Sequence, residues 1–308
     1  MSDTLKVSDT YIRIMKNFRT IINPEKFPFT ISHKDKIVSI GSCFSENIGK
    51  KFNDYKFPTN INPFGQQYNP YSIAKAIERL LKGTPYTKDE LLFHDELYHS
   101  FDHHGSFSRS SVEEALHVIN TNLIRASEDL KNATVLFLTF GTSHVFTLKS
   151  IVGDNTNNGY RIVSNCHKLS GNNFDKRLMM PSEIVEILSK VISELLTVNR
   201  QLKIILTVSP VRYFAFGHHE NTVSKAHLFS AIHELQQQNS DYFYFPAYEL
   251  VIDDLRDYRF FSEDMLHPNY QATDYVWEKL CEAMIAPKTL EVMQGNKNTR
   301  CAVVAIHE

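Results

Sequence analysis

The stretch Lys-Ile-Val-Ser-Ile-Gly-Ser-Cys-Phe-Ser-Glu-Asn-Ile, residues 36–48, decides the fold of this chain. Its first six residues form a mostly apolar run that ends at a glycine, which is typical of a buried β-strand. From Ser45 to Asp54 the apolar residues have helical spacing, so a strand passes almost directly into a helix. Ligands bind at this edge of open α/β sheets, where backbone N–H groups and the positive end of a helix converge. Ser42 and Cys43 are therefore candidate nucleophiles.

The rest of the chain alternates between strand and helix patterns. Because successive strands are separated by amphipathic segments, we expect a three-layer α/β/α fold with a mainly parallel central sheet. Residues 145–165 interrupt the alternation and predict a β-hairpin excursion with its turn at 153–159. The predicted strands after the first are 134–140, 203–208 and 242–246, and the predicted helices after the first are 70–81, 112–129, 182–196, 224–238 and 273–285.

Length and composition indicate one large globular domain. A hydrophobic content of 42% is too high for a disordered chain. The 33 Lys and Arg residues are balanced by 35 Asp and Glu residues, which argues against a nucleic-acid partner held by bulk charge. We expect residues 36–286 to form the domain, residues 1–35 to be an irregular leader that packs on it, and residues 287–308 to be a loose tail.

The sequence also predicts the compartment. It has no run of about 18 apolar residues, so we expect no membrane insertion. The N-terminus lacks the apolar core of a signal peptide. The four cysteines, at positions 43, 166, 281 and 301, show neither a disulfide framework nor zinc-ribbon spacing. These features favour a reduced, cytoplasmic protein.

A second fragment, Asp264-Met265-Leu266-His267-Pro268, supplies a carboxylate and an imidazole far from the first motif in sequence. Polar residues also follow the strands predicted at 134–140 and 203–208. Each group alone is a weak signal, but carboxyl ends of parallel strands share one sheet edge. Their coincidence predicts a nucleophile and a base assembled from opposite ends of the chain.

The sequence Gly-Ser-Cys-Phe-Ser at 41–45 resembles the signature of the GSCFA family, with Ser45 in place of the usual alanine. The resemblance covers about residues 18–285. That family is placed with the SGNH/GDSL hydrolases, so the resemblance implies a flavodoxin-like α/β/α fold and ester cleavage. It continues through Asn62-Pro63-Phe64-Gly65, Gly141-Thr142, Asn165-Cys166-His167-Lys168, the run 207–212, and the segment from Tyr258 to Pro268.

The hydrolase motifs can be carried over position by position. The Gly-Asp-Ser motif falls on residues 41–43, which places the nucleophile at Cys43 and puts Ser42 where the family has aspartate. The resemblance implies an oxyanion role for Gly65 and the acid–base pair for Asp264 and His267. The Gly-x-Asn-Asp motif falls on residues 141–144, where the oxyanion asparagine is absent and Ser143 stands instead.

Three further residues are candidates for substrate contact. Asn165 can replace the missing oxyanion asparagine, because a side-chain amide can donate to an oxyanion. His167 can contact substrate, although an ordinary turn beside a buried cysteine explains both residues equally well. Arg212 follows a predicted strand and can bind a carboxylate or phosphate, or pair with a nearby aspartate.

Cys43 is expected to be the most reactive cysteine, because a helix N-terminus and a nearby imidazolium both favour thiolate. Alternatively, Cys43 is a small buried apolar residue and Ser42 is the nucleophile. Ser45 is interpreted either as a cap of the following helix or as a surface hydroxyl. The pairs His103-His104 and His218-His219 lack metal-ligand spacing, so we expect no metal and no cofactor.

The leading hypothesis is an acyl-ester hydrolase or acyltransferase acting on a small-molecule or glycan ester. Cys43 or Ser42 would attack the acyl carbonyl, and His267, oriented by Asp264, would accept the proton. The first alternative is a non-catalytic module that binds a glycan or small ligand in the same cleft. The second is a metal-dependent hydrolase that uses the histidines.

Overall fold

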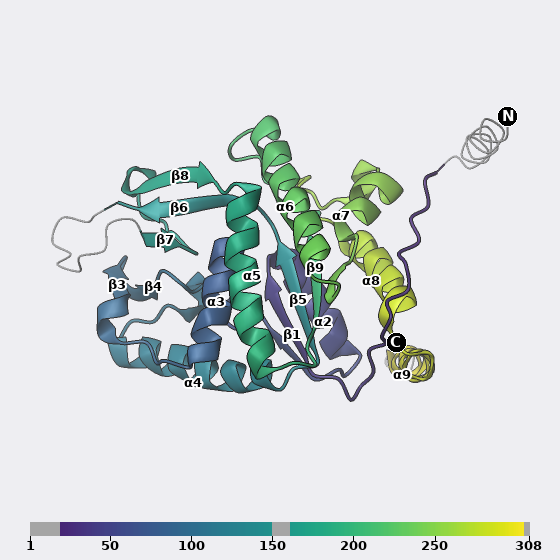
Figure 1. The fold of residues 1–308 in the computed structure, drawn as a ribbon. Coiled ribbons are helices and arrows are strands. Elements are labelled where there is room, and N and C mark those ends of the chain that lie inside the picture. The colour runs from purple at the N-terminus through teal and green to yellow at the C-terminus, as the bar shows by residue number, and fades with distance from the viewer. Residues whose placement is uncertain (1–18, 150–160, 305–308) are drawn as a thin grey trace.

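A parallel five-stranded sheet forms the centre of the protein (Figure 1). The structure is a computed structural model that describes residues 19–149 and 161–304. The strand order is β2-β1-β5-β9-β10, which is the flavodoxin-like order with its switch point between β1 and β5. The strands are β1 (Ile37–Gly41), β2 (Thr59–Ile61), β5 (Val135–Phe140), β9 (Lys203–Val208) and β10 (Tyr242–Tyr244). The predicted α/β/α fold is confirmed.

Helices cover both faces of this sheet because its strands are apolar on both faces. Four helices bury one face: α3 (Pro70–Lys82), α4 (Val112–Lys131), α5 (Pro181–Val198) and α6 (His218–Gln238). The other face lies under α2 (Cys43–Asp54), α7 (Ala247–Glu249), the adjoining π-helix Leu250–Leu255, α8 (Tyr270–Met284) and α9 (Pro287–Val304).

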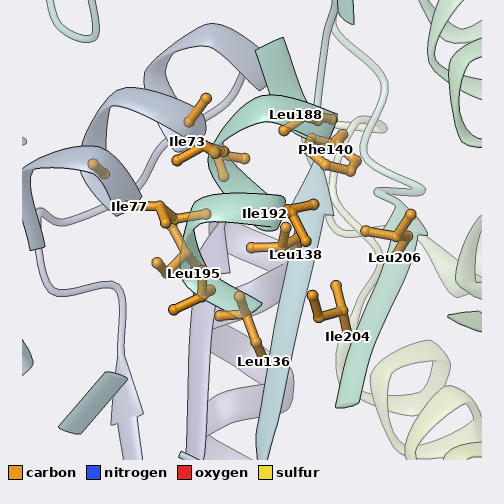
Figure 2. Close-up of a cluster of buried hydrophobic side chains, with 14 of the residues drawn as sticks. Ile73, Ile77, Leu136, Leu138, Phe140, Leu188, Ile192, Leu195, Ile204 and Leu206 are labelled. Carbon is orange, nitrogen blue, oxygen red and sulfur yellow. The ribbon is translucent and has the colours of Figure 1, made fainter. Parts of the chain in front are cut away.

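The side chains of β5 point alternately to the two faces of the sheet, so this strand contributes to both hydrophobic cores. Leu136 and Leu138 point toward α3 and α5, as Figure 2 shows, whereas Phe137 belongs to the opposite cluster. Leu138 is completely buried, so its truncation to alanine should cost about 2–5 kcal/mol of unfolding free energy. The core on both faces fixes the register of β5 and therefore the position of the loop that follows it.

Two small antiparallel sheets lie to one side of the central sheet (Figure 1). The expected hairpin is present as β6 (His144–Leu148) paired with β7 (Arg161–Val163), and β8 (Phe174–Leu178) adds a third strand that the sequence did not predict. The predicted turn at 153–159 lies outside the described residues. The other sheet is the hairpin of β3 (Leu91–His94) and β4 (Leu97–Ser100).

Both end segments of the described chain pack against the domain. Residues 19–35 have little regular structure, and Ile31 forms a parallel bridge with Ile285. Residues 1–18 of the expected leader lie outside the described residues. Residues 287–304 form helix α9 instead of the loose tail that the sequence suggested, and Leu290 and Met293 pack on the α2–α8 core. Within the described residues, every helix is too short or too polar to cross a lipid bilayer.

Candidate active site

The turn Gly41–Cys43, here called the nucleophile turn, leaves the sheet at the switch point between β1 and β5. Its backbone is held by Asn62, whose side-chain oxygen accepts from Gly41 N at 2.9 Å, and by Thr139 O, which accepts from Ser42 N at 3.2 Å. A Cβ at Gly41, where φ is +158°, would lie 2.3 Å from Thr139 O. Only glycine therefore permits this close approach to β5.

Cys43 is the first residue of α2 and is half-buried, whereas Ser42 before it is 1% exposed. Among the described residues the Ser42 hydroxyl has no hydrogen-bond partner. Cys43 is the more accessible of the two, so the geometry favours it over Ser42 as the nucleophile. Ser45 neither caps the helix nor faces solvent, because it is buried and its hydroxyl lies 2.6 Å from the Ser39 hydroxyl.

A cavity of about 400 Å³, here called the nucleophile cavity, opens beside Cys43. Its wall comes from the carboxyl ends of β1, β5 and β9 and from the loop that carries His267. This is the edge at which open α/β sheets bind ligands. The remaining lining residues are Ser42, Tyr68, Asn69, Gly141, Thr142, His144, Phe146, Val163, Ser164, Ser209, Val211, Arg212, Tyr213 and Leu266.

His267 is held on the cavity wall by its own loop. Asp264 accepts from the backbone N–H groups of Leu266 and His267 at 2.9 and 3.0 Å, and its other oxygen lies 2.6 Å from His267 Nδ1. Arg212 N donates to Leu266 O at 3.1 Å, which ties the loop to the residues that follow β9. The two backbone N–H groups and the imidazole lower the pKa of Asp264 to about 2, so the carboxylate stays ionised. Nε2 of His267 is left to serve as a base.

Lys225 is a buried cation behind the cavity wall. This residue of α6 is 3% exposed, and its ammonium donates to Gly141 O at 2.7 Å and Ser209 O at 2.6 Å. It thereby joins the ends of β5 and β9 that line the cavity. Burial lowers the pKa of Lys225 to about 7; the charge of Arg212 acts in the same direction, and a Cys43 thiolate opposes it.

The loop before α3 supplies an amide. Asn69 is 5% exposed and caps α3, since its Oδ1 accepts from Ser72 N at 2.8 Å. This bond fixes the amide so that Nδ2 is the free end, and no described residue accepts from it. The preceding carbonyl, Tyr68 O, accepts from the N–H groups of Gly141 and Thr142 at 2.8 and 3.0 Å, so those N–H groups are already used.

Opposing influences act on the pKa of the Cys43 thiol. Burial raises its pKa above the ordinary value, and the Glu46 carboxylate adds to this rise. The backbone N–H groups of Phe44 and Cys43 and the charge of Lys225 act in the opposite direction. The net rise means that the resting thiol is protonated near neutral pH, contrary to the sequence-based expectation of a lowered pKa. Attack then needs a base.

The candidate residues separate into two groups. The structure brings Ser42, Cys43, His267 and Arg212 to the nucleophile cavity, with Asp264 behind His267. The other four do not line it: Gly65, Ser143, Asn165 and His167.

Each of these four has another role. Gly65 N donates to Asn62 O at 2.7 Å, and Ser143 is fully buried, with its N–H bonded to the Ser224 hydroxyl. Asn165 Oδ1 accepts from His167 N at 2.8 Å, and His167 Nε2 lies 2.8 Å from Ser100 O.

Sequence reasoning missed Asn69 and Lys225. Asn69 precedes Pro70, a pattern that indicates a helix cap and gives no sign that the amide could also donate to an oxyanion. Lys225 lies three residues before Leu228 on the buried face of α6, so a charge in an apolar stripe was the available signal. Within the described residues, no three His, Cys, Asp or Glu side chains are grouped so that they could hold a metal ion.

Comparison with solved structures finds distant likenesses. A proposed acylhydrolase from Bacteroides fragilis is 11% identical, with 85% of this chain and 89% of that chain covered and a TM-score of 0.39. A mutant acetyl esterase with acetate ion is 8% identical, with 84% and 98% covered and a TM-score of 0.36. A carbohydrate esterase of family 3 from Talaromyces cellulolyticus is 7% identical, with 54% and 65% covered and a TM-score of 0.27. This degree of likeness carries no weight for the chemistry.

Curated proteins give no match to the sequence. The sequence model of the GSCFA family, by contrast, matches residues 36–280, from just before β1 to a point inside α8. The match includes the nucleophile turn and the loop of Asp264 and His267. The chain belongs to the GSCFA family.

Proposed function

We propose that this protein is an acyl-ester hydrolase or acyltransferase that works through a thioester on Cys43. One observation carries the proposal: a thiol at a helix start and an imidazole held by a carboxylate open on one cavity, although 224 residues separate them in sequence. Nucleophilic catalysis needs a nucleophile and a base that face the same bound substrate, and a shared cavity allows this.

In the first half-reaction the Cys43 sulfur attacks the acyl carbonyl carbon, and the thiol proton passes to Nε2 of His267. The carbonyl oxygen becomes an oxyanion, for which the Cys43 N–H and Asn69 Nδ2 are the best-placed donors. The bond between the acyl carbon and the leaving oxygen then breaks. His267 returns the proton to that oxygen, and the acyl group remains on sulfur as a thioester.

In the second half-reaction water or an acceptor hydroxyl attacks the thioester. His267 takes the proton of the attacking oxygen, the carbon–sulfur bond breaks, and the proton passes to the sulfur. Asp264 keeps the imidazole oriented and stabilises its charged form. The ammonium of Lys225 favours the transient thiolate and holds the cavity wall in place.

Turnover of 4-nitrophenyl acetate tests this proposal. Thiol-dependent release of nitrophenol, lost in Cys43→Ala and in His267→Ala, supports it. Turnover that survives in Cys43→Ala but not in Ser42→Ala would move the nucleophile to the serine. An absence of turnover with this and longer acyl chains would favour the binding module instead.

A further inference from the structure

A second cavity of about 520 Å³ adjoins the first. Arg212 and Leu266 line both cavities, so they stand on the wall between them. The rest of the second cavity comes from the residues after β9, the segment 251–261, and the loop that bears His267. It also presents Tyr258, which is 77% exposed.

The charges of the second cavity are unevenly paired. Its two carboxylates have partners: Asp257 lies 3.6 Å from the Arg259 guanidinium, and Asp264 bonds the His267 imidazole. Its two guanidinium groups, those of Arg212 and Arg256, form no hydrogen bond or ion pair with any described side chain. An arginine fork without a carboxylate partner is a ready site for a carboxylate or phosphate group.

Arg212 is the better placed of the two. It is half-buried, and its guanidinium carbon lies 5.9 Å from the Phe214 ring. It is also near the buried Lys225, as its effect on that ammonium shows. Among the described residues, Arg212 therefore presents to both cavities a guanidinium without a carboxylate partner.

The position of His267 indicates which part of the substrate reaches Arg212. His267 must protonate the leaving oxygen, so the leaving group lies on the side of the His267 loop. Asp264, Met265 and Leu266 of that loop line the second cavity. A leaving group that passes His267 therefore enters the second cavity beside Arg212.

We infer that the substrate carries an anionic group, a carboxylate or a phosphate, on its leaving-group side and that Arg212 binds it. This inference rests on the proposed function, because the direction of the leaving group follows from the role of His267. The acyl side faces the apolar part of the nucleophile cavity, formed by Phe146, Val163 and Val211. Neutral esters are then poor substrates compared with esters of the same acyl group on an anionic alcohol or phenol.

Binding can be tested without turnover. In the Cys43→Ala variant, calorimetry should show 4-hydroxybenzoate or 4-hydroxyphenyl phosphate binding at least about tenfold more tightly than phenol. The tighter of the two identifies the anion. Adding Arg212→Gln should remove this preference, whereas Arg200→Gln, an equal loss of charge at an exposed residue outside both cavities, should preserve it. Equal binding of all three, no binding, or a preference unchanged by Arg212→Gln would overturn the inference.

Turnover separates this inference from the proposed function. We expect Arg212→Gln to lower the ratio of kcat/KM for 4-acetoxybenzoate to kcat/KM for phenyl acetate at least about tenfold. Intrinsic ester reactivity cancels when variants are compared. An equal loss for both esters would refute the anion site and leave the proposed function intact. An anion preference in binding, without turnover of either ester, would refute the proposed function and leave the anion site intact.

Discussion

Two turns of this protein carry the same chemical groups in different surroundings. The nucleophile turn places Cys43 on a cavity shared with His267, and the turn 165–167 holds Cys166 beside His167. At the second turn burial raises the pKa of the Cys166 thiol to about 11 and lowers that of His167 to about 4. At the first, backbone N–H groups and Lys225 oppose the effect of burial on Cys43. A thiol near an imidazole is thus not enough: Cys43 differs from Cys166 in lining the cavity and in the groups that oppose the effect of burial on its pKa.

The largest expected contrast lies between the two cysteines. Cys43→Ala should lower ester turnover by about 10³-fold or more, because the covalent route is lost. Cys166→Ala should leave turnover within about twofold, since Cys166 does not line the cavity. Initial rates with an aryl ester, on variants of matched thermal stability, measure both. A comparable loss in the two variants would erase the distinction between the turns.

The two histidines give the next contrast. His267→Ala should reduce kcat by about 10²–10⁴-fold, the usual contribution of a general base. Asp264→Asn should cost less, because the carboxylate is exposed and its interaction is screened by solvent. His167→Ala should instead cost about 1–3 kcal/mol of unfolding free energy, because the buried carbonyl of Ser100 loses its hydrogen-bond partner. Activity loss in His167→Ala with unchanged stability would contradict this division of roles.

The two asparagines Asn69 and Asn165 give a third contrast. The sequence alone does not distinguish them as oxyanion donors. Asn69→Ser keeps a helix cap but removes the amide donor, so kcat should fall about 10²-fold with little change in Tm. Asn165→Ser should leave kcat unchanged. If Asn69→Ser lowered Tm and activity together, the amide would be structural and the oxyanion would need another donor.

The last contrast concerns stability rather than turnover, namely the pH dependence of unfolding that Lys225 causes. Its pKa is about 7 in the folded protein and close to 10.5 when unfolded. Between these values the unfolded chain binds about one more proton, so the free energy of unfolding rises with pH from about 7 to about 10. In Lys225→Met this part of the rise should disappear. Denaturant unfolding at several pH values measures it, and an identical pH dependence in the variant would show that folding does not lower the pKa of Lys225.

Much of the fold followed from hydrophobic patterning. The strands at 37–41, 135–140 and 203–208 are continuous apolar runs, and only a sheet covered on both faces explains them. β2 was missed because its three residues lie between Pro58 and Pro63, where breakers suggest a loop. β8 was missed because its central residues are exposed and charged, so the strand lacks the apolar signal of a buried one.

The site was predictable where a residue follows a strand directly. Cys43 reaches the cavity because β1 ends at Gly41, and no loop conformation intervenes. Gly65 and Asn165 lie in longer connections, whose paths depend on tertiary contacts such as the packing of Gly65 against His104. Their positions could not be derived from spacing, and neither residue lines the cavity.

The central claim is that an acyl group passes through the sulfur of Cys43. Mass spectrometry of the protein quenched in acid during turnover of an activated aryl ester tests it most directly. We expect the acyl mass on the peptide that contains Cys43, removed by hydroxylamine as a thioester is, and more persistent in His267→Ala if any forms. Cys166 should remain unmodified in the same digest. An acyl group mapped to Ser42, or turnover without any modified peptide, would contradict the account.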